Sequence, residues 1–136
     1  MLAERLPQWW PFSDTNAALA RLKKCYRLGV LSNIDKDLFA ATAKHFTVDF
    51  DFVITAEDVK SYKPGTAHFR QAIASQGPPE SLLHVAQSLY HDGVPTAELN
   101  IAFVWINRYK ERNHTGVRPL VEFPDLCSFA DSVCGP

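Results

Sequence analysis

The sequence predicts an α/β fold in which helices cover a mostly parallel sheet. Short apolar runs alternate with amphipathic segments over residues 13–107, and polar residues follow each apolar run. Strands that alternate with helices in this way are typical of parallel sheets with right-handed crossover connections. At 136 residues the chain is long enough to form one domain, 1–136, with a core of its own.

The first predicted elements are a helix, a strand and a second helix. The first helix begins at Asp14 or Thr15, because both residue types cap helix N-termini. The mostly apolar run 26–31 is a predicted strand. Asp35 or Asp37 opens the next helix, whose buried side carries Leu38, Phe39, Ala43 and Phe46.

The same pattern then repeats. The run 50–55 is a predicted strand, and the polar segment 56–63 is a predicted loop. Pro64 suits the first turn of a third helix, because proline fixes a helical φ and needs no N–H partner there. Gly77 ends that helix.

The last third of the chain predicts further strands and helices. The runs 82–86 and 101–106 are predicted strands, with a short helix around 94–99 between them. Residues 108–118 form a charged surface loop, and Pro124 opens a final helix that buries Leu126, Phe129 and Val133.

The composition excludes several classes of partner. Charged residues make up 21% of the chain and the net charge is -1, so no broad electrostatic field attracts nucleic acid or an acidic membrane surface. No apolar run approaches the roughly 20 residues that span a bilayer, and the first residues lack the layout of a signal peptide. We therefore expect no nucleic-acid partner, no membrane partner and a cytoplasmic location.

The cysteines and histidines show no metal-binding spacing. Cys25, Cys127 and Cys134 are odd in number and lack a Cys-x-x-Cys pair, which predicts idle or buried thiols. The histidines form no His-Glu-x-x-His motif, and His84 within a strand is predicted to be a core histidine with a satisfied partner. No glycine-rich nucleotide loop occurs either, so we expect no cofactor and no metal.

Polar residues at three strand ends are the candidate functional residues. Ser32 and Asn33 follow one predicted strand, Lys63 follows the next, and Gln87, Ser88 and Asp92 follow the third. Ligands of open parallel sheets bind beyond the carboxyl ends of the strands, where such loops meet. Singly, each residue also fits a plain structural role, as a helix cap or a solvated charge.

These stretches resemble a known family. Leu31-Ser32-Asn33-Ile34-Asp35, Ser61-Tyr62-Lys63-Pro64 and His84-Val85-Ala86-Gln87-Ser88-Leu89-Tyr90-His91-Asp92, followed by Val104-Trp105-Ile106-Asn107-Arg108, resemble motifs two, three and four of the haloacid dehalogenase (HAD) superfamily. The likeness extends from about Leu6 to the C-terminus and is closest to the type II, (S)-2-haloacid dehalogenase-like branch. It implies a three-layer, Rossmann-like core.

The resemblance also implies roles for individual residues. Lys63 and Asp92 would be catalytic: the lysine offsets negative charge at the nucleophile, and the aspartate orients the lysine or helps to activate water. Ser32, Asn33 and Ser88 would bind an anionic substrate. These roles suit the side chains, because an ammonium lowers the pKa of a neighbouring carboxylate and Ser and Asn donate to oxyanions.

The sequence departs from the family at its first motif. The family reacts through an aspartate in Asp-x-Asp or Asp-x-Tyr after an apolar strand, and that strand lies mid-sheet in the order five, four, one, two, three. Asp49-Phe50-Asp51-Phe52 precedes a strand instead of following one, so it does not fit the motif. We expect a partial core that lacks the motif-one strand and the cap: a linker at 1–12, alternating helices and strands at 13–107, and a loop with a C-terminal helix at 108–136.

Three functions remain open from the sequence. The first is the C-terminal part of a HAD-like hydrolase, as a truncated reading frame, splice form or degenerate copy, which is inactive alone and acts on a small anionic substrate if completed. The second is a non-catalytic interaction protein. The third is a magnesium-dependent phosphatase, which Gln87 disfavours because phosphatases of the family place an aspartate there and an amide is a poorer ligand for Mg²⁺.

The missing strand carries a structural expectation of its own. Either the strands at 26–31 and 82–86 close up directly, or the missing segment or another chain fills the slot between them. The exposed sheet edges would then pair with a second copy of the chain or with a complementing chain.

Overall fold

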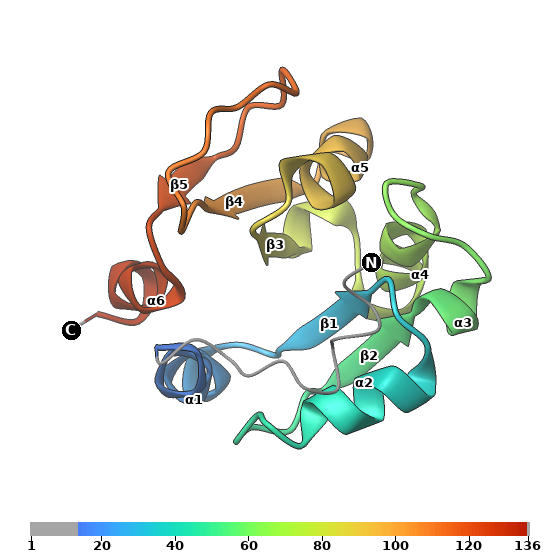
Figure 1. Cartoon of the computed structure of the whole chain (residues 1–136), viewed down its shortest axis with the longest axis horizontal. Coiled ribbons are helices and arrows are strands. Elements are labelled where there is room, and N and C mark those ends of the chain that lie inside the picture. The colour runs from blue at the N-terminus through green and yellow to red at the C-terminus, as the bar shows by residue number, and fades with distance from the viewer. Residues whose placement is uncertain (1–13, 136) are drawn as a thin grey trace. The chain divides into compact units, whose positions relative to one another are not determined.

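The computed structural model describes residues 14–135, which form two compact units (Figure 1). The first unit holds the chain up to Lys60 together with the segment from Leu126 onward, and the second spans Ser61–Asp125. We describe each unit by itself. The predicted linker at 1–12, with its paired tryptophans, lies outside the described residues, and the assignment of 1–136 to a single domain stays a prediction.

A short parallel sheet forms the centre of the first unit. The elements are α1 (Thr15–Cys25), β1 (Gly29–Ser32), α2 (Lys36–Ala43), β2 (Phe52–Thr55), α3 (Ala56–Val59) and α6 (Leu126–Cys134). β1 and β2 are parallel, with Gly29 opposite Phe52 and Ser32 opposite Thr55. A Cβ atom at Gly29 would lie 2.0 Å from the ring of Phe52, so a larger residue at the start of β1 would require that ring to move.

Side-chain caps explain where the helices of this unit begin. The carboxylate of Asp35 accepts a hydrogen bond from the N–H of Leu38 at 2.8 Å, which confirms Asp35 as the start of α2. Thr55 and Asp58 form a reciprocal capping box, which starts α3 directly after β2. This helix lies inside the segment that we predicted to be a loop. The prediction missed it because the capping box depends on two polar residues and leaves no periodic apolar pattern in the sequence.

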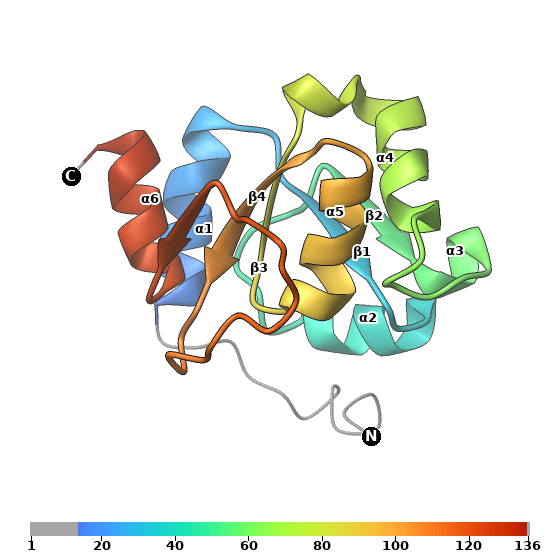
Figure 2. The same ribbon diagram turned by 90° about the horizontal axis from the view of Figure 1, so that it is seen from above.

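α1 and α6 lie side by side in the first unit (Figures 1 and 2). The carboxylate of Asp14 accepts hydrogen bonds from the N–H groups of Leu126 at 3.0 Å and Cys127 at 3.1 Å, so it caps α6 and not α1. Two turns further along α1, the guanidinium of Arg21 pairs with Asp131 and donates to the carbonyl of Gly135. The two helices therefore run parallel and are tied at both ends.

A three-stranded parallel sheet forms the centre of the second unit. The elements are α4 (Ala67–Gln76), η2 (Pro79–Ser81), β3 (Leu83–Ala86), η3 (Leu89–Gly93), α5 (Val94–Glu98), β4 (Ala102–Ile106) and β5 (Val121–Phe123). The strand order is β3-β4-β5, with Ala86 opposite Trp105 and Trp105 opposite Glu122. Leu89, Phe103 and Trp105 pack into a buried cluster at the carboxyl end of β3.

The boundaries of the second unit differ from the prediction at two places. Pro64 does not start α4; it lies in a turn closed by the N–H of Gly65 and the carbonyl of Tyr62 at 2.9 Å, and the helix begins at Ala67. Gly77 ends α4 as predicted. β5 was not predicted, because a three-residue strand with Glu122 at its centre has no clear alternation of apolar and polar residues.

The strands at 26–31 and 82–86 each find a sheet partner within their own unit. In the described part of the chain, β1 pairs with β2 in one sheet and β3 pairs with β4 in another. Both halves of the expectation, direct closing of the two strands and filling of the slot by another segment or chain, stay predictions. The α/β class and the parallel pairing are confirmed. No helix among residues 14–135 combines the length and the apolar composition needed to cross a membrane.

Replacement of Asp14 by alanine is expected to lower the free energy of unfolding by about 1–2 kcal/mol, because α6 loses the acceptor for its first two N–H groups. Urea denaturation followed by circular dichroism measures the change. Asp49→Ala is the control, since Asp49 is an exposed aspartate outside the helices. Equal loss in both variants would contradict the capping role.

Candidate functional site

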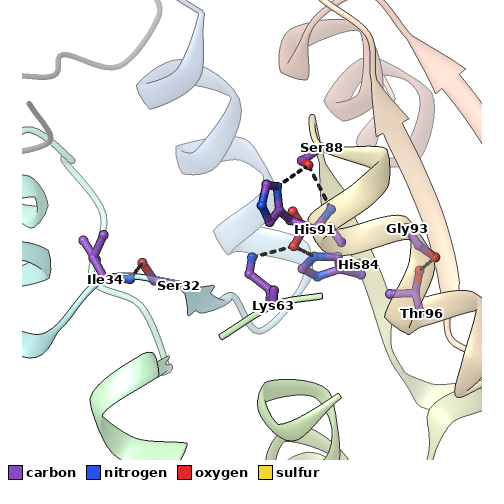
Figure 3. Close-up of polar contacts among 9 residues, drawn as sticks. Ser32, Ile34, Lys63, His84, Ser88, His91, Gly93 and Thr96 are labelled. Carbon is purple, nitrogen blue, oxygen red and sulfur yellow. Dashed lines mark hydrogen bonds and ion pairs between the residues drawn. The ribbon is translucent and has the colours of Figure 1, made fainter. Parts of the chain in front are cut away.

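A buried ion pair of the second unit joins Lys63 to Asp92 (Figure 3). The Nζ atom of Lys63 lies 2.6 Å from Oδ1 of Asp92, and the two side chains are only 9% and 8% exposed. Lys63 is presented by the turn that closes between Tyr62 and Gly65, ahead of α4. The pair therefore brings together a residue of the predicted motif three and the last residue of the predicted motif four.

His84 is the second partner of the same carboxylate oxygen. Its Nε2 atom lies 2.8 Å from Oδ1 of Asp92. The centroids of its ring and the Phe69 ring lie 4.8 Å apart in a T-shaped arrangement, with an interplanar angle of 83°. Its ring stacks on that of Phe103, with the centroids 6.1 Å apart and an interplanar angle of 26°. The aromatic rings from α4 and β4 thus hold the imidazole in place on β3, directed at the carboxylate.

The backbone after β3 explains why Asp92 reaches these partners. The hydroxyl of Ser88 accepts a hydrogen bond from the N–H of His91 at 3.0 Å and so caps the single wide turn η3. The carbonyl of Ser88 accepts from the N–H of Asp92 at 3.0 Å. The fully buried hydroxyl of Thr96 donates to the carbonyl of Gly93 at 2.9 Å and ties η3 to α5. Asp92 therefore lies in a turn that is fixed from both sides.

The surroundings of Asp92 act on its pKa in opposite directions. Burial alone raises the pKa of this carboxyl, because removal from water disfavours the charge. The hydrogen bond and charge of His84, followed by the charge and hydrogen bond of Lys63, outweigh burial, so the pKa of Asp92 lies below its ordinary value. The site therefore holds an ionised carboxylate, and its lowered pKa makes this carboxylate a weak base.

The structure brings some of the predicted site residues together and describes others separately. Lys63 and Asp92 are in contact, whereas Ser88 bonds to His91, with Oγ 3.0 Å from Nδ1. Ser32 lies at the end of β1 in the first unit, where its hydroxyl accepts from the N–H of Ile34 at 3.3 Å (Figure 3). Asn33 follows it and is half-buried. The predicted roles of all five residues stay predictions.

The part of His84 at this site was not predicted. The sequence indicated a core histidine with a satisfied partner, which agrees with its position between two aromatic rings, but it did not identify Asp92 as that partner. The available signal was the position of His84 on β3, two residues before the strand ends, followed by an acidic residue in the next turn. An eight-residue separation does not by itself predict a contact, because the intervening turn sets the direction of Asp92.

The residues present do not suit a divalent cation well. Among residues 14–135, no group of His, Cys, Asp and Glu side chains is arranged to hold a metal ion. The side chain of Gln87 is an amide and not a carboxylate. The backbone carbonyl of Gln87 is already used, since it accepts a hydrogen bond from Nε1 of Trp105 at 2.9 Å. The one carboxylate of the site, Asp92, already binds two donors through a single oxygen. This donor set fits an ammonium and an imidazole better than it fits Mg²⁺.

Comparison with known proteins supports the resemblance of the motifs. Residues 3–106 match the family model of the haloacid dehalogenase-like hydrolases. The chain is 32% identical over 118 residues to the haloacid dehalogenase-like hydrolase domain-containing protein 3 of Danio rerio, and the match covers 82% of this chain and 48% of that protein.

Solved structures share the fold over nearly the whole chain. A dehalogenase matches with a TM-score of 0.87 at 20% identity, over 96% of this chain and 60% of its own. A HAD phosphatase from Thermococcus onnurineus matches with a TM-score of 0.77 at 25% identity, over 98% of this chain and 63% of its own. The chain thus spans about half the length of the curated relative and about three-fifths of these structures. With the parallel strands, the motif order and the match over residues 3–106 taken together, this chain belongs to the haloacid dehalogenase-like hydrolase family.

Proposed function

We propose that this chain supplies the lysine-and-acid part of a hydrolase that acts on a small anionic substrate through a carboxylate ester. The observation that supports the proposal most is the buried contact between Lys63 and Asp92, in which a carboxylate fixes the direction of an ammonium. The nucleophilic aspartate would come from a segment outside this sequence. By itself, the chain would be inactive, because a lysine and its partner position and polarise but do not replace a nucleophile.

In the proposed reaction, the nucleophilic carboxylate attacks the halogen-bearing carbon of a short 2-haloacid and the halide leaves. Water then hydrolyses the ester, which releases a 2-hydroxy acid and restores the carboxylate. Lys63 would keep the nucleophile ionised by lowering its pKa. Asp92 would orient Lys63, and its lowered pKa suits that role better than the activation of water. Ser32 and Asn33 would bind the substrate carboxylate, as their resemblance to motif two of the family implies.

Two alternatives remain as proposals. A non-catalytic interaction protein would use the same fold without chemistry, and it is favoured if the gene encodes no further segment. A magnesium-dependent phosphatase is the third choice, since one similar structure is a HAD phosphatase. The amide of Gln87 argues against it, because Mg²⁺ prefers carboxylate oxygen and water at such a position.

The deciding experiment is to read the gene upstream of Met1 and to search the encoded sequence for an apolar strand that ends in Asp-x-Asp or Asp-x-Tyr. If it is present, the longer protein is expected to release halide from 2-chloropropionate, and Lys63→Met should lower kcat by about 100-fold or more. Phosphate release from an aryl phosphate that stops on addition of a chelator would favour the phosphatase. If the longer frame is absent and the purified chain releases neither product, the interaction protein is favoured.

Lys63→Met is expected to raise the pKa of Asp92, because the carboxylate stays buried but loses the ammonium. A carboxyl whose pKa is lowered by folding stabilises the fold above its unfolded pKa of about 3.9, and the contribution disappears as the pH falls through the folded pKa. The variant should therefore lose stability at a higher pH than the unaltered chain. Near neutral pH it should be about 3–5 kcal/mol less stable. Urea denaturation at a series of pH values measures both effects.

Lys44→Met is the matched control for this prediction, since Lys44 is exposed at the end of α2. Its pH profile should follow that of the unaltered chain. A Lys63→Met profile that also follows the unaltered chain would show that the contact contributes nothing to the ionisation of Asp92.

His84→Phe is expected to raise the pKa of Asp92 with little change in volume, because the new ring occupies the space between Phe69 and Phe103 but donates no hydrogen bond. A carbon NMR titration of the Asp92 carboxyl group measures the pKa directly. His91→Phe is the control, as His91 is an exposed histidine of the same turn. An unchanged titration in His84→Phe would remove His84 from the set of positioning residues.

A further inference from the structure

The seam between α1 and α6 brings together two cysteines that are far apart in the sequence. Asp14, which directly precedes α1, and Arg21 and Cys25 within α1 recur at helical spacing, so they lie on one face of the helix. The first two of these residues bind α6 directly, through its N-terminal N–H groups and through Asp131. Cys25 therefore continues, at the last turn of α1, the stripe that contacts α6.

The facing stripe of α6 ends in Cys134. The spacing between Asp131 and Cys134 is three residues, so both lie on the side of α6 that meets Arg21. The Sγ atom of Cys134 lies 3.8 Å from the carbonyl oxygen of Arg21. In an α-helix that carbonyl also accepts the N–H of the residue four positions later, which is Cys25. The sulfur of Cys134 thus contacts the same carbonyl group of Arg21 that is hydrogen-bonded to the backbone N–H of Cys25.

We propose that Cys25 and Cys134 form a reversible intramolecular disulfide when the chain meets a small-molecule disulfide such as oxidised glutathione. The thiolate of Cys25 attacks one sulfur of the oxidant, forms a mixed disulfide and releases one small thiolate. The thiolate of Cys134 then attacks Sγ of Cys25 and releases the second. The two protein thiols lose two protons and two electrons in total, and the oxidant gains them as two thiols.

The surroundings of the two thiols set the order of these steps. Cys25 is exposed and open to an oxidant from solution, whereas Cys134 is half-buried in the seam. Burial and a hydrogen bond with the Cys25 side chain raise the pKa of the Cys134 thiol. Cys134 is thereby held as a thiol beside Cys25 and is poorly suited to react first. It acts as the resolving group once Cys25 carries the mixed disulfide.

The third cysteine provides an internal comparison. Cys127 is seven residues before Cys134, which places it about 10 Å away along the axis of α6, at the end that Asp14 caps. A disulfide needs Cα atoms within about 7 Å of each other. Because Cys127 lies beside Asp14, directly before α1, and Cys25 is the last residue of α1, eleven residues later, Cys127 is too far along the seam to compete for Cys25. The idle thiols expected from the sequence are thus one idle thiol and one reactive pair.

In the experiment, the reduced, folded chain is incubated with oxidised glutathione, and its intact mass and its number of free thiols are measured. The expected product has lost two hydrogens, carries no glutathione and retains one of its three thiols. Peptide mapping should place the bond between Cys25 and Cys134. The thermal midpoint of the oxidised chain should lie above that of the reduced chain, because the bond closes a long loop in the unfolded state.

Single serine variants separate the proposal from general thiol reactivity. Cys127→Ser should form the bond as the unaltered chain does, whereas Cys134→Ser should stop at the mixed disulfide on Cys25. In denaturant the unaltered chain should lose its preference for the pair. A stable glutathione adduct on Cys25 in the folded, unaltered chain, or a bond that includes Cys127, would overturn the proposal.

Discussion

The carboxylate of Asp92 has little contact with water, and a charge in that position is tolerated only when donors surround it. Its two donors come from different elements: Lys63 from the turn before α4, and His84 from β3. The donors and the acceptor meet only if α4 packs over β3 and η3 turns Asp92 inward. The ion cluster thus requires the tertiary packing of α4, β3 and η3.

The same arrangement decides what Asp92 is able to do chemically. Removal of one donor from a buried charge leaves an uncompensated ion, so loss of Lys63 destabilises the fold more than loss of one partner of an exposed pair would. A carboxylate whose pKa is lowered holds a cation well and accepts a proton from water poorly. Under the proposed function, this geometry favours an orienting role for Asp92, and the nucleophile and any stronger base would come from a segment outside this sequence.

Local sequence signals predicted the elements whose cause is local. Apolar runs located β1 to β4, Asp35 located α2 and Gly77 ended α4, because burial on one face and capping act within a few residues. β5 depends instead on pairing with β4 and on Asn107, whose N–H donates to Phe123 and whose side chain donates to Glu122. The contact of His84 with Asp92 and the partner of Cys25 likewise depend on tertiary packing, so neither has a signal in the local pattern.

The first unit is closed by residues from both ends of the described chain, and this sets a cost that the second unit does not have. The pairing of Arg21 with Asp131 joins positions 110 residues apart, and closing so long a loop costs conformational entropy that grows with its length. α1 buries Ala18 and Leu22, and α6 buries Phe129 and Ala130, so this seam must offset that cost by apolar burial. A covalent bond at the same seam would remove part of the entropy from the unfolded chain beforehand. The proposed bond between Cys25 and Cys134 would close this same long loop, and in the chain-entropy model a longer loop gives a larger stabilisation.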